Sequence, residues 1–159
     1  MPPIQIIVAM TRDRVIGEKG ELPWNLPHDL KLFCQLTIGK TVLMGRTTYQ
    51  SIGKPLAQRR NIVISRSLAV TQGIELCRTF SEGVNLARSF GHDIFCIGGV
   101  EIYRQALPLA ERLHISWVDG AFSGDSLFPE FELTDWSETD RRSYTGFTYS
   151  TYLRKKNAL

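Results

Sequence analysis

The sequence contains neither a disulfide framework nor an apolar run long enough to cross a membrane. Its three cysteines, Cys34, Cys77 and Cys96, are odd in number, widely spaced and without a Cys-x-x-Cys pair. This usage is typical of reduced, mostly buried thiols in the cytoplasm, where we expect the protein to work. The first residues lack a basic region followed by a long apolar stretch, so neither a signal peptide nor a membrane partner is expected.

Several signatures of nucleotide, hydrolase and metal sites are also absent. There is no G-x-G-x-x-G, which argues against an ordinary Rossmann domain, and no G-x-S-x-G nucleophile turn. Gly39-Lys40-Thr41 imitates the end of a P-loop, but Cys34 stands where the first glycine belongs, and the triplet precedes a predicted strand instead of following one. The three histidines lie too far apart in sequence to suggest a site, and no metal is expected.

The composition is that of a globular protein with a core of useful size. Hydrophobic residues make up 43% of the 159 residues and charged residues 22%, in the range of ordinary globular domains. The formal net charge of +3 suits a small anionic ligand and is weak evidence for nucleic acid, which we do not expect as a partner. We therefore expect a single domain over residues 1–159.

Short apolar runs alternate with helical patterns along most of the chain. Strands are predicted at residues 4–10, 41–44, 61–65, 74–77, 93–97 and 112–118, with a polar loop at 11–23 and an antiparallel hairpin of 136–142 with 147–153. Helices are predicted after Asn25, over 45–52, from a Ser81 cap through Ala87, and from Gly98 through Leu107. This order predicts an α/β fold with a mostly parallel eight-stranded central sheet, an antiparallel C-terminal hairpin and about four flanking helices.

The first predicted helix carries an acid among apolar residues. Asn25 is expected to cap its start, and Pro27 is tolerated in a first turn because its missing N–H has no helical partner there. At 100° per residue, one apolar stripe consists of Leu26, Leu30, Phe33 and Leu36. Asp29 lies between Phe33 and Leu36 on the helical wheel, so its carboxylate is expected to point into or along this stripe.

Three interpretations of Asp29 remain open at this point. It can serve the helix dipole as a first-turn acid, or it can be bonded to a core group. The functional alternative is a carboxylate in an apolar pocket that binds a cationic or amidine-like heterocycle through two parallel hydrogen bonds.

Three predicted strand ends carry features of phosphate binding. Gly45-Arg46-Thr47-Thr48 and Gly98-Gly99 each open a predicted helix, where free backbone N–H groups and the absence of a side chain favour an anion. Residues 65–67, Ser-Arg-Ser, add a cation and hydroxyls at a third strand end. Each feature alone is commonly only a turn. Together they favour a dinucleotide with several phosphates at the carboxyl ends of the strands.

A chain of motifs resembles the successive signatures of bacterial dihydrofolate reductase. These motifs are Val-Ile-Gly (15–17), Leu-Pro-Trp-Asn-Leu-Pro-His-Asp (22–29), Met-Gly-Arg-Thr-Thr-Tyr (44–49), Ser-Ile-Gly-Lys-Pro-Leu (51–56), Arg-Arg-Asn-Ile (59–62) and Ile-Gly-Gly-Val-Glu-Ile-Tyr (97–103). Their order and spacing match the family from about residue 4 to residue 155. The resemblance implies NADPH-dependent reduction of 7,8-dihydrofolate to tetrahydrofolate, with a hydride to C6 and a proton to N5.

The resemblance also implies roles for residues in catalysis and substrate binding. Asp29 corresponds to the carboxylate that holds the 2-amino and N3 edge of the pteridine, Trp24 to the tryptophan that holds a water, and Arg59 to the arginine that binds the glutamate α-carboxylate. Leu22 and Ser116 complete the catalytic group, at positions where the family commonly has methionine and threonine. The walls around the substrate correspond to Ile7, Val8, Leu30, Phe33, Ile52, Leu56 and Ile97.

For the cofactor, the resemblance implies a site that runs along the strand ends. The nicotinamide contacts correspond to Ala9, Ile16 and Gly17, and the loop from Gly17 to Gly20 corresponds to a lid. The pyrophosphate contacts correspond to Gly45, Arg46, Thr47, Thr48, Gly98, Gly99, Val100, Glu101, Ile102 and Tyr103, with a cis bond between the two glycines. The 2′-phosphate region, which favours NADPH over NADH, corresponds to Arg46, Ser65 and Arg66 with Ile64 beside them. Glu101 stands where some relatives have a basic residue.

The implied partners are dihydrofolate and antifolate inhibitors such as trimethoprim and methotrexate, bound by a monomer. Two alternatives stay open. A pyrimidine reductase of riboflavin synthesis would share the phosphate contacts, but it should lack Arg59 and the spacing of Trp24, Asp29 and Phe33. A nucleotide-binding module without turnover would keep Gly98-Gly99 and would not need Asp29.

Overall fold

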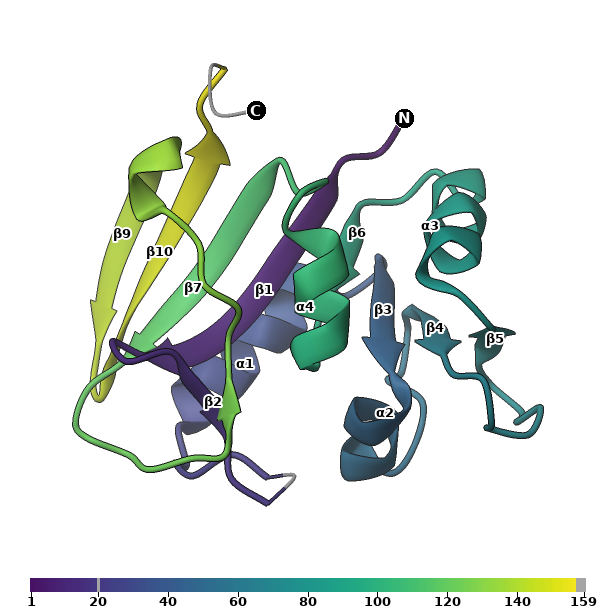
Figure 1. Cartoon of the computed structure of the whole chain (residues 1–159), viewed down its shortest axis with the longest axis horizontal. Coiled ribbons are helices and arrows are strands. Elements are labelled where there is room, and N and C mark those ends of the chain that lie inside the picture. Colours follow the sequence, from purple (N-terminus) through teal and green to yellow (C-terminus); the bar gives the residue numbers. More distant parts are fainter. Residues whose placement is uncertain (20, 157–159) are drawn as a thin grey trace.

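The computed structural model describes residues 1–19 and 21–156, and its main feature is one twisted sheet of eight strands (Figure 1). In spatial order the strands are β5 (Glu75–Cys77), β4 (Arg60–Ile64), β3 (Thr41–Gly45), β6 (Ile94–Cys96), β1 (Ile4–Thr11), β7 (Arg112–Val118), β10 (Phe147–Arg154) and β9 (Trp136–Tyr144). The first six strands of this order pair in parallel, and β10 and β9 add antiparallel pairs. The predicted fold class is confirmed.

One of two short paired strands lies in the segment expected to be a polar loop. β2 (Val15–Gly17) pairs antiparallel with β8 (Ser126–Leu127). The prediction of an uninterrupted loop over 11–23 was therefore wrong. Segments of three and two residues are too short to show an alternating pattern, and they become strands because two loops from distant parts of the chain meet.

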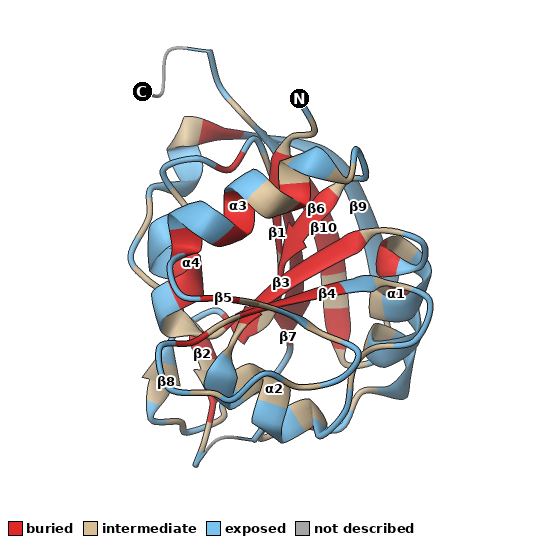
Figure 2. Ribbon diagram, turned by 90° about the vertical axis from the view of Figure 1, so that its right-hand side faces the viewer, coloured by how far each residue is buried: buried red, intermediate tan, exposed pale blue. Residues whose placement is uncertain are grey.

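The helices form a layer on each face of the sheet (Figure 2). α3 (Phe80–Ser89) and α4 (Val100–Ala106) pack on one face, over Leu43, Ile62 and Cys96. α1 (Pro27–Thr37) and α2 (Arg46–Ile52) cover the other face, and a 3-10 turn (Leu133–Asp135) precedes β9. Because the inner strands are covered on both sides, they read as continuous apolar runs. Among the helices described, none is of a length and apolarity that would span a bilayer.

The start of α1 differs from the expectation. Leu26, not Asn25, is the N-cap residue, and no side chain bonds to the first turn. Asn25 is exposed, whereas Pro27 occupies the first turn as predicted. The predicted stripe is divided as well: Leu26 and Leu36 pack around buried Leu32, but Leu30 is 57% exposed. The division arises because one side of α1 packs on the sheet and the adjacent side borders a cleft.

The start of α3 also lies two residues before the expected cap. The hydroxyl of Thr79 accepts a hydrogen bond from Glu82 N–H at 3.1 Å, and the Glu82 carboxylate accepts from Arg78 N–H at 3.0 Å. This reciprocal arrangement closely resembles a capping box, for which Thr79-x-x-Glu82 is the sequence signal. Ser81 is an exposed residue inside the first turn.

We expect Thr79→Ala to lower the free energy of unfolding by about 1 kcal/mol, because it removes the acceptor for an N–H group of the first turn. Ser81→Ala is the matched control, and it should change the stability by less than about 0.5 kcal/mol. Urea unfolding followed by circular dichroism measures both. A larger loss in Ser81→Ala than in Thr79→Ala would contradict the assignment of the cap.

Candidate active site

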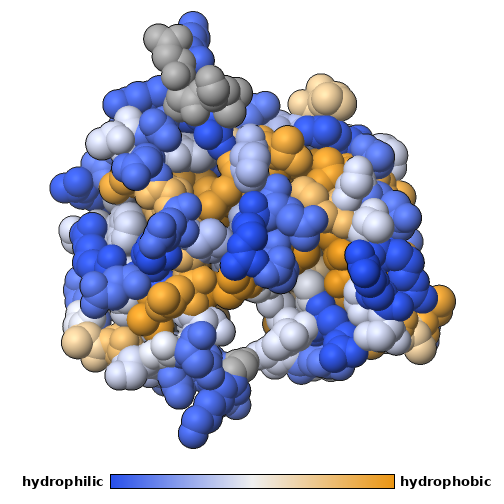
Figure 3. Space-filling view, in the orientation of Figure 1, coloured by the Kyte–Doolittle hydropathy of each residue, from blue (hydrophilic) through white to orange (hydrophobic). Residues whose placement is uncertain are grey.

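A cleft of about 900 Å³ lies where strands β3, β4 and β6 end, between α1, α2 and the loop that carries β2. In the space-filling view, the molecule is hollowed between the β2 loop and α2 (Figure 3). Parallel strands of an α/β sheet commonly place ligands at this edge. The cleft brings together segments from the first 17 residues, both glycine turns and β7, which the sequence separates widely.

Asp29 is held in the cleft by a hydrogen bond to the sheet. Its carboxylate oxygen Oδ1 accepts from the Ser116 hydroxyl on β7 at 2.6 Å, and no cation pairs with it among the described residues. Burial raises the pKa of the Asp29 carboxyl above its ordinary value, while the bond from Ser116 acts in the opposite direction. The carboxylate therefore retains capacity to accept hydrogen bonds from a ligand.

The predicted substrate walls all border this cleft. They are Ile7, Val8, Leu30, Phe33, Ile52, Leu56 and Ile97. Arg59 lies at the rim, where its guanidinium donates to Thr37 Oγ1 at 3.0 Å and to the Ala57 carbonyl at 2.9 Å. These neutral acceptors fix the side chain without neutralising it, and the structure gives it no carboxylate partner within residues 1–19 and 21–156. The geometry leaves Arg59 able to bind an anion.

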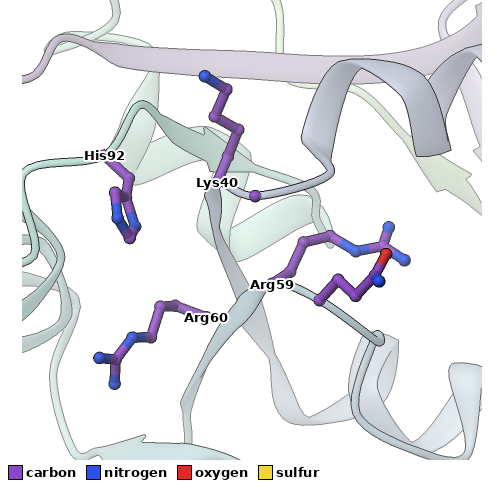
Figure 4. A pocket seen from close by; sticks show the side chains of 6 residues that line it. Lys40, Arg59, Arg60 and His92 are labelled. Atoms are coloured by element: carbon purple, nitrogen blue, oxygen red, sulfur yellow. The ribbon is translucent and has the colours of Figure 1, made fainter.

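A smaller hollow of about 360 Å³ lies beyond Arg59 (Figure 4). It is lined by Gly39, Lys40, Gln58, Arg59, Arg60 and His92. Its basic side chains diverge: the Arg59 guanidinium points toward the end of α1, and Arg60 lies 3.7 Å from the Glu75 carboxylate and over the Phe90 ring. Because these charges do not converge, the larger cleft is the candidate site.

The two glycine turns lie against each other at the cleft. Gly45 N–H donates to the Gly98 carbonyl at 2.9 Å, and the Gly98–Gly99 peptide is cis, as the resemblance implied. Gly98 has φ +116°, and an added Cβ would lie 3.2 Å from the Tyr103 hydroxyl. That hydroxyl donates to the Ile7 carbonyl at 3.0 Å, which ties α4 to β1. Glycine is therefore required at 98 both by the backbone conformation and by the close ring.

The third phosphate-type turn is built differently. Ser65 Oγ accepts from the backbone N–H groups of Ser67 and Leu68, at 3.2 and 3.0 Å, and the Arg78 guanidinium donates to two carbonyls of the same turn. Ser65 is buried and does not line the cleft, so its hydroxyl serves the turn. Arg46 does line the cleft and donates to Ser67 Oγ at 2.7 Å. Arg66 is exposed outside the cleft, without an ion pair to any described residue.

Trp24 stands behind the cleft instead of lining it. Its ring packs edge-on against Phe122 with centroids 5.5 Å apart, and its buried Nε1 has no hydrogen-bond partner in the described part of the chain. Leu22 does line the cleft and is half exposed. Of the predicted lid, Gly17 pairs with Ser126, whereas Gly20 lies outside the described residues.

The remaining residues predicted for the cofactor all line the cleft: Ala9, Ile16, Gly17, Gly45, Thr47, Thr48, Ile64, Gly98, Gly99, Val100, Glu101, Ile102 and Tyr103. The prediction missed further lining residues, namely Glu21, Leu32, Cys34, Leu36, Ser51, Gln105, Ser126 and Tyr149. Cys34 follows Leu30 by one helical turn, so helical periodicity was a usable signal for it. Tyr149 on β10 lines the cleft because it pairs with Ser116 on β7. Sequence spacing does not reveal such a pairing.

The fold and the cleft define an α/β nucleotide-binding protein whose apolar pocket holds, among the described residues, one half-buried carboxylate, that of Asp29, at the edge where the glycine turns meet. Comparison with known proteins gives the family. The family model of dihydrofolate reductase matches residues 3–154, and the chain belongs to the dihydrofolate reductase family. Its predicted activity, NADPH-dependent reduction of dihydrofolate, is the activity of that family, and the two alternatives are set aside.

Individual relatives support the same assignment. The chain is 43% identical to the dihydrofolate reductase of Haemophilus influenzae over 131 residues, which cover 82% of this chain and 81% of that protein. It is 35% identical to dihydrofolate reductase type 3 of Salmonella typhimurium, with 94% and 92% covered. A solved dihydrofolate reductase of Enterococcus faecalis, in complex with NADP(H) and RAB-propyl, has a TM-score of 0.85 and 28% identity, with 97% of each chain covered.

The raised pKa of Asp29 predicts a pH-dependent cost to stability. Between the pKa of an aspartate in the unfolded chain, about 3.9, and the higher folded-state value, the folded protein binds more protons than the unfolded one. The stability of the wild type relative to Asp29→Asn should therefore fall as pH rises through this window and level off above it. Urea unfolding of both proteins at stepped pH measures the difference, and a difference that rises with pH would contradict the assigned burial.

Proposed function

We propose that Asp29 is the residue on which this reductase holds the pterin ring of dihydrofolate. The observation that carries the proposal is a half-buried carboxylate that accepts one hydrogen bond, from Ser116, inside an apolar cleft. The 2-amino and N3 edge of a pterin offers two parallel donors, which match the oxygens of a carboxylate. Flat basic inhibitors of the antifolate type present the same edge and should compete for Asp29.

The apolar walls orient the substrate and exclude water. Phe33 on α1 and Ile52 on α2 border the cleft together with Ile7 on β1, so a planar ring between the helices is confined to one layer. Such confinement favours near-attack contact between two rings and removes solvent from the reacting carbon. Arg59 at the rim binds the α-carboxylate of the substrate's glutamate through its planar fork.

The proton for N5 reaches the site through water, because the part of the cleft that the structure describes holds no second buried acid beside Asp29. Glu21 and Glu101, the other acids of the lining, are exposed. Trp24 supports this route, since its buried Nε1 is unpartnered and can donate to a water at the back of the site. Leu22 shields the entrance, and Asp29 sets the charge that favours a protonated pterin.

The residues along the strand ends fit NADPH. The two glycine turns meet at the cleft, where a Cβ at 98 would be crowded by Tyr103, and a pyrophosphate can approach their backbone. Arg46 and Arg66, which have no carboxylate partner in the part of the chain that the structure describes, supply cations for the 2′-phosphate. Ala9, Ile16 and Gly17 form the part of the cleft that receives the nicotinamide. When bound, NADPH supplies the hydride.

We also infer that the enzyme works as a monomer in the cytoplasm. Asp29, Arg59 and both glycine turns line one cleft, so this chain supplies every element that the proposed function needs. The three cysteines of the protein are free. A reducing compartment keeps such thiols unpaired.

The role of Asp29 is tested by Asp29→Asn, which keeps the shape of the side chain and removes its charge. Loss of NADPH absorbance with dihydrofolate establishes the activity of the wild type. In single-turnover experiments at neutral pH, hydride transfer in the variant should slow by about 10- to 100-fold, the equivalent of charged hydrogen bonds worth about 1.5–3 kcal/mol. The Kd for NADPH should stay near that of the wild type.

Asp140→Asn on β9, where the carboxylate pairs with Arg142 at 3.0 Å on the surface, is the matched control and should leave both quantities unchanged. Equal losses of hydride transfer and cofactor affinity in Asp29→Asn would sink the assigned role.

Cofactor choice is tested by Arg46→Ala combined with Arg66→Ala. NADPH binding should weaken by about 1.5–3 kcal/mol for each charge-assisted bond lost, while NADH, which lacks the 2′-phosphate, should bind almost as before. Fluorescence titration gives both Kd values. Arg141→Ala, an exposed arginine paired with Glu138, controls for net charge. If the affinity for NADH falls as much as that for NADPH, Arg46 and Arg66 do not bind the 2′-phosphate.

A further inference from the structure

Three buried polar side chains form a continuous hydrogen-bonded chain across three neighbouring strands. His114 on β7 lies between Gln5 on β1 and Tyr149 on β10, and all three are at most 6% exposed. His114 Nδ1 is 2.7 Å from the Tyr149 hydroxyl, and His114 Nε2 is 2.7 Å from Gln5 Oε1. Burying polar side chains costs free energy unless they form hydrogen bonds, whereas apolar side chains would fill this interior without that cost. We therefore asked what these three side chains contribute.

The direction of every hydrogen bond in this chain is fixed. Gln5 Oε1 can only accept, so His114 Nε2 carries the proton and Nδ1 accepts from Tyr149 O–H. Burial and the nearby Arg112 lower the pKa of His114 to about 4, which leaves the ring neutral with one donor and one acceptor. Burial raises the pKa of Tyr149 to about 12, so the phenol keeps the proton it donates. A hydrogen-bonded network of this kind favours one arrangement of its side chains.

This network lies on the face of the sheet that carries α1. Tyr149 is the cross-strand partner of Ser116, and His114 is the partner of Ile7, so it adjoins two residues of the cleft. Tyr149 belongs to the same buried cluster as Leu32 of α1 and Phe147, and Leu36 packs against this cluster. Leu32 is three residues beyond Asp29, one helical turn along. The Tyr149 ring therefore supports the turn of α1 that carries the carboxylate.

We propose that Gln5, His114 and Tyr149 are positioning residues. Their hydrogen bonds fix the Tyr149 ring under α1, and the ring keeps Asp29 at hydrogen-bonding distance from Ser116. This inference rests on the proposed role of Asp29. Asp29 Oδ1 and Ser116 Oγ are 2.6 Å apart, and they belong to different layers of the fold. Their separation depends on the height of α1 above β7. Displacements of about 1 Å at such a contact are enough to slow a reaction that needs two aligned rings.

The chain offers a matched pair of substitutions for the test. Tyr149→Phe removes one hydroxyl that bonds β10 to β7 on the face of α1. Tyr152→Phe removes a hydroxyl between the same two strands on the opposite face, where it accepts from Trp117 Nε1 at 2.9 Å. Both rings are buried, and both substitutions delete one hydrogen bond. A purely structural role predicts the same consequence for both.

Tyr149→Phe should slow single-turnover hydride transfer about fivefold, the equivalent of one hydrogen bond of about 1 kcal/mol, with the Kd for NADPH unchanged. Tyr152→Phe should keep the wild-type rate. His114→Gln, which retains a donor and an acceptor, should stay closer to wild type than His114→Leu, which has neither. If His114→Leu does not fold, the two tyrosine variants still decide the matter.

The inference is overturned if Tyr149→Phe transfers hydride at the wild-type rate, or if both tyrosine variants are slowed equally. Its failure is distinguishable from failure of the proposed function. Slow hydride transfer in Asp29→Asn with a wild-type rate in Tyr149→Phe removes only the positioning role. A wild-type rate in Asp29→Asn removes the role of Asp29 itself.

Discussion

The hydrogen bond between Ser116 and Asp29 is the contact on which the cleft depends. It joins a helix to the sheet and holds a half-buried carboxylate in an apolar cleft. A buried carboxylate is costly unless it has partners, and here the protein supplies only part of the hydrogen bonding. The unmet part is what a ligand with two parallel donors can provide. The free-energy cost of burying the Asp29 carboxylate with one hydrogen bond is thus the same feature that favours binding of such a ligand.

Most of the fold could be predicted because its inner strands are covered on both faces and stand out as apolar runs. The boundaries of β7 were predicted to the residue, and those of β1 to within one. The order of strands in the sheet could not be deduced in this way, because an apolar run predicts a strand but contains no information on which strands pair with it. The misplaced caps have a local cause: Asn25 and Ser81 are good capping residues by type, and the backbone turned into the helix at Leu26 and Thr79 instead.

The site was predictable where its residues fall in contiguous motifs. Asp29, Arg59 and the glycine turns belong to short segments whose chemistry is visible in sequence, and the fold brings them to one cleft. Tyr149 was not predictable, because its place beside Ser116 follows from the register of two antiparallel strands. Ser65 shows the reverse case. Its residue type suggested a phosphate contact, but its buried hydroxyl lies outside the cleft lining and accepts from backbone N–H groups of its own turn.

The position of β1 in the sheet bears on how the protein is made. Both neighbours of β1, which are β6 and β7, come much later in the chain, so that Ile4 pairs with Ile94 and Gln5 with Arg112. Contacts of such long sequence separation form slowly, because loop closure precedes any gain from pairing. Until both neighbours have been synthesised, the backbone N–H and C=O groups along both edges of β1 are unpaired and its apolar side chains are uncovered, and both features promote aggregation. The strand that later contributes Ile7, Val8 and Ala9 to the cleft lining is thus, during synthesis, a segment exposed to association with other chains.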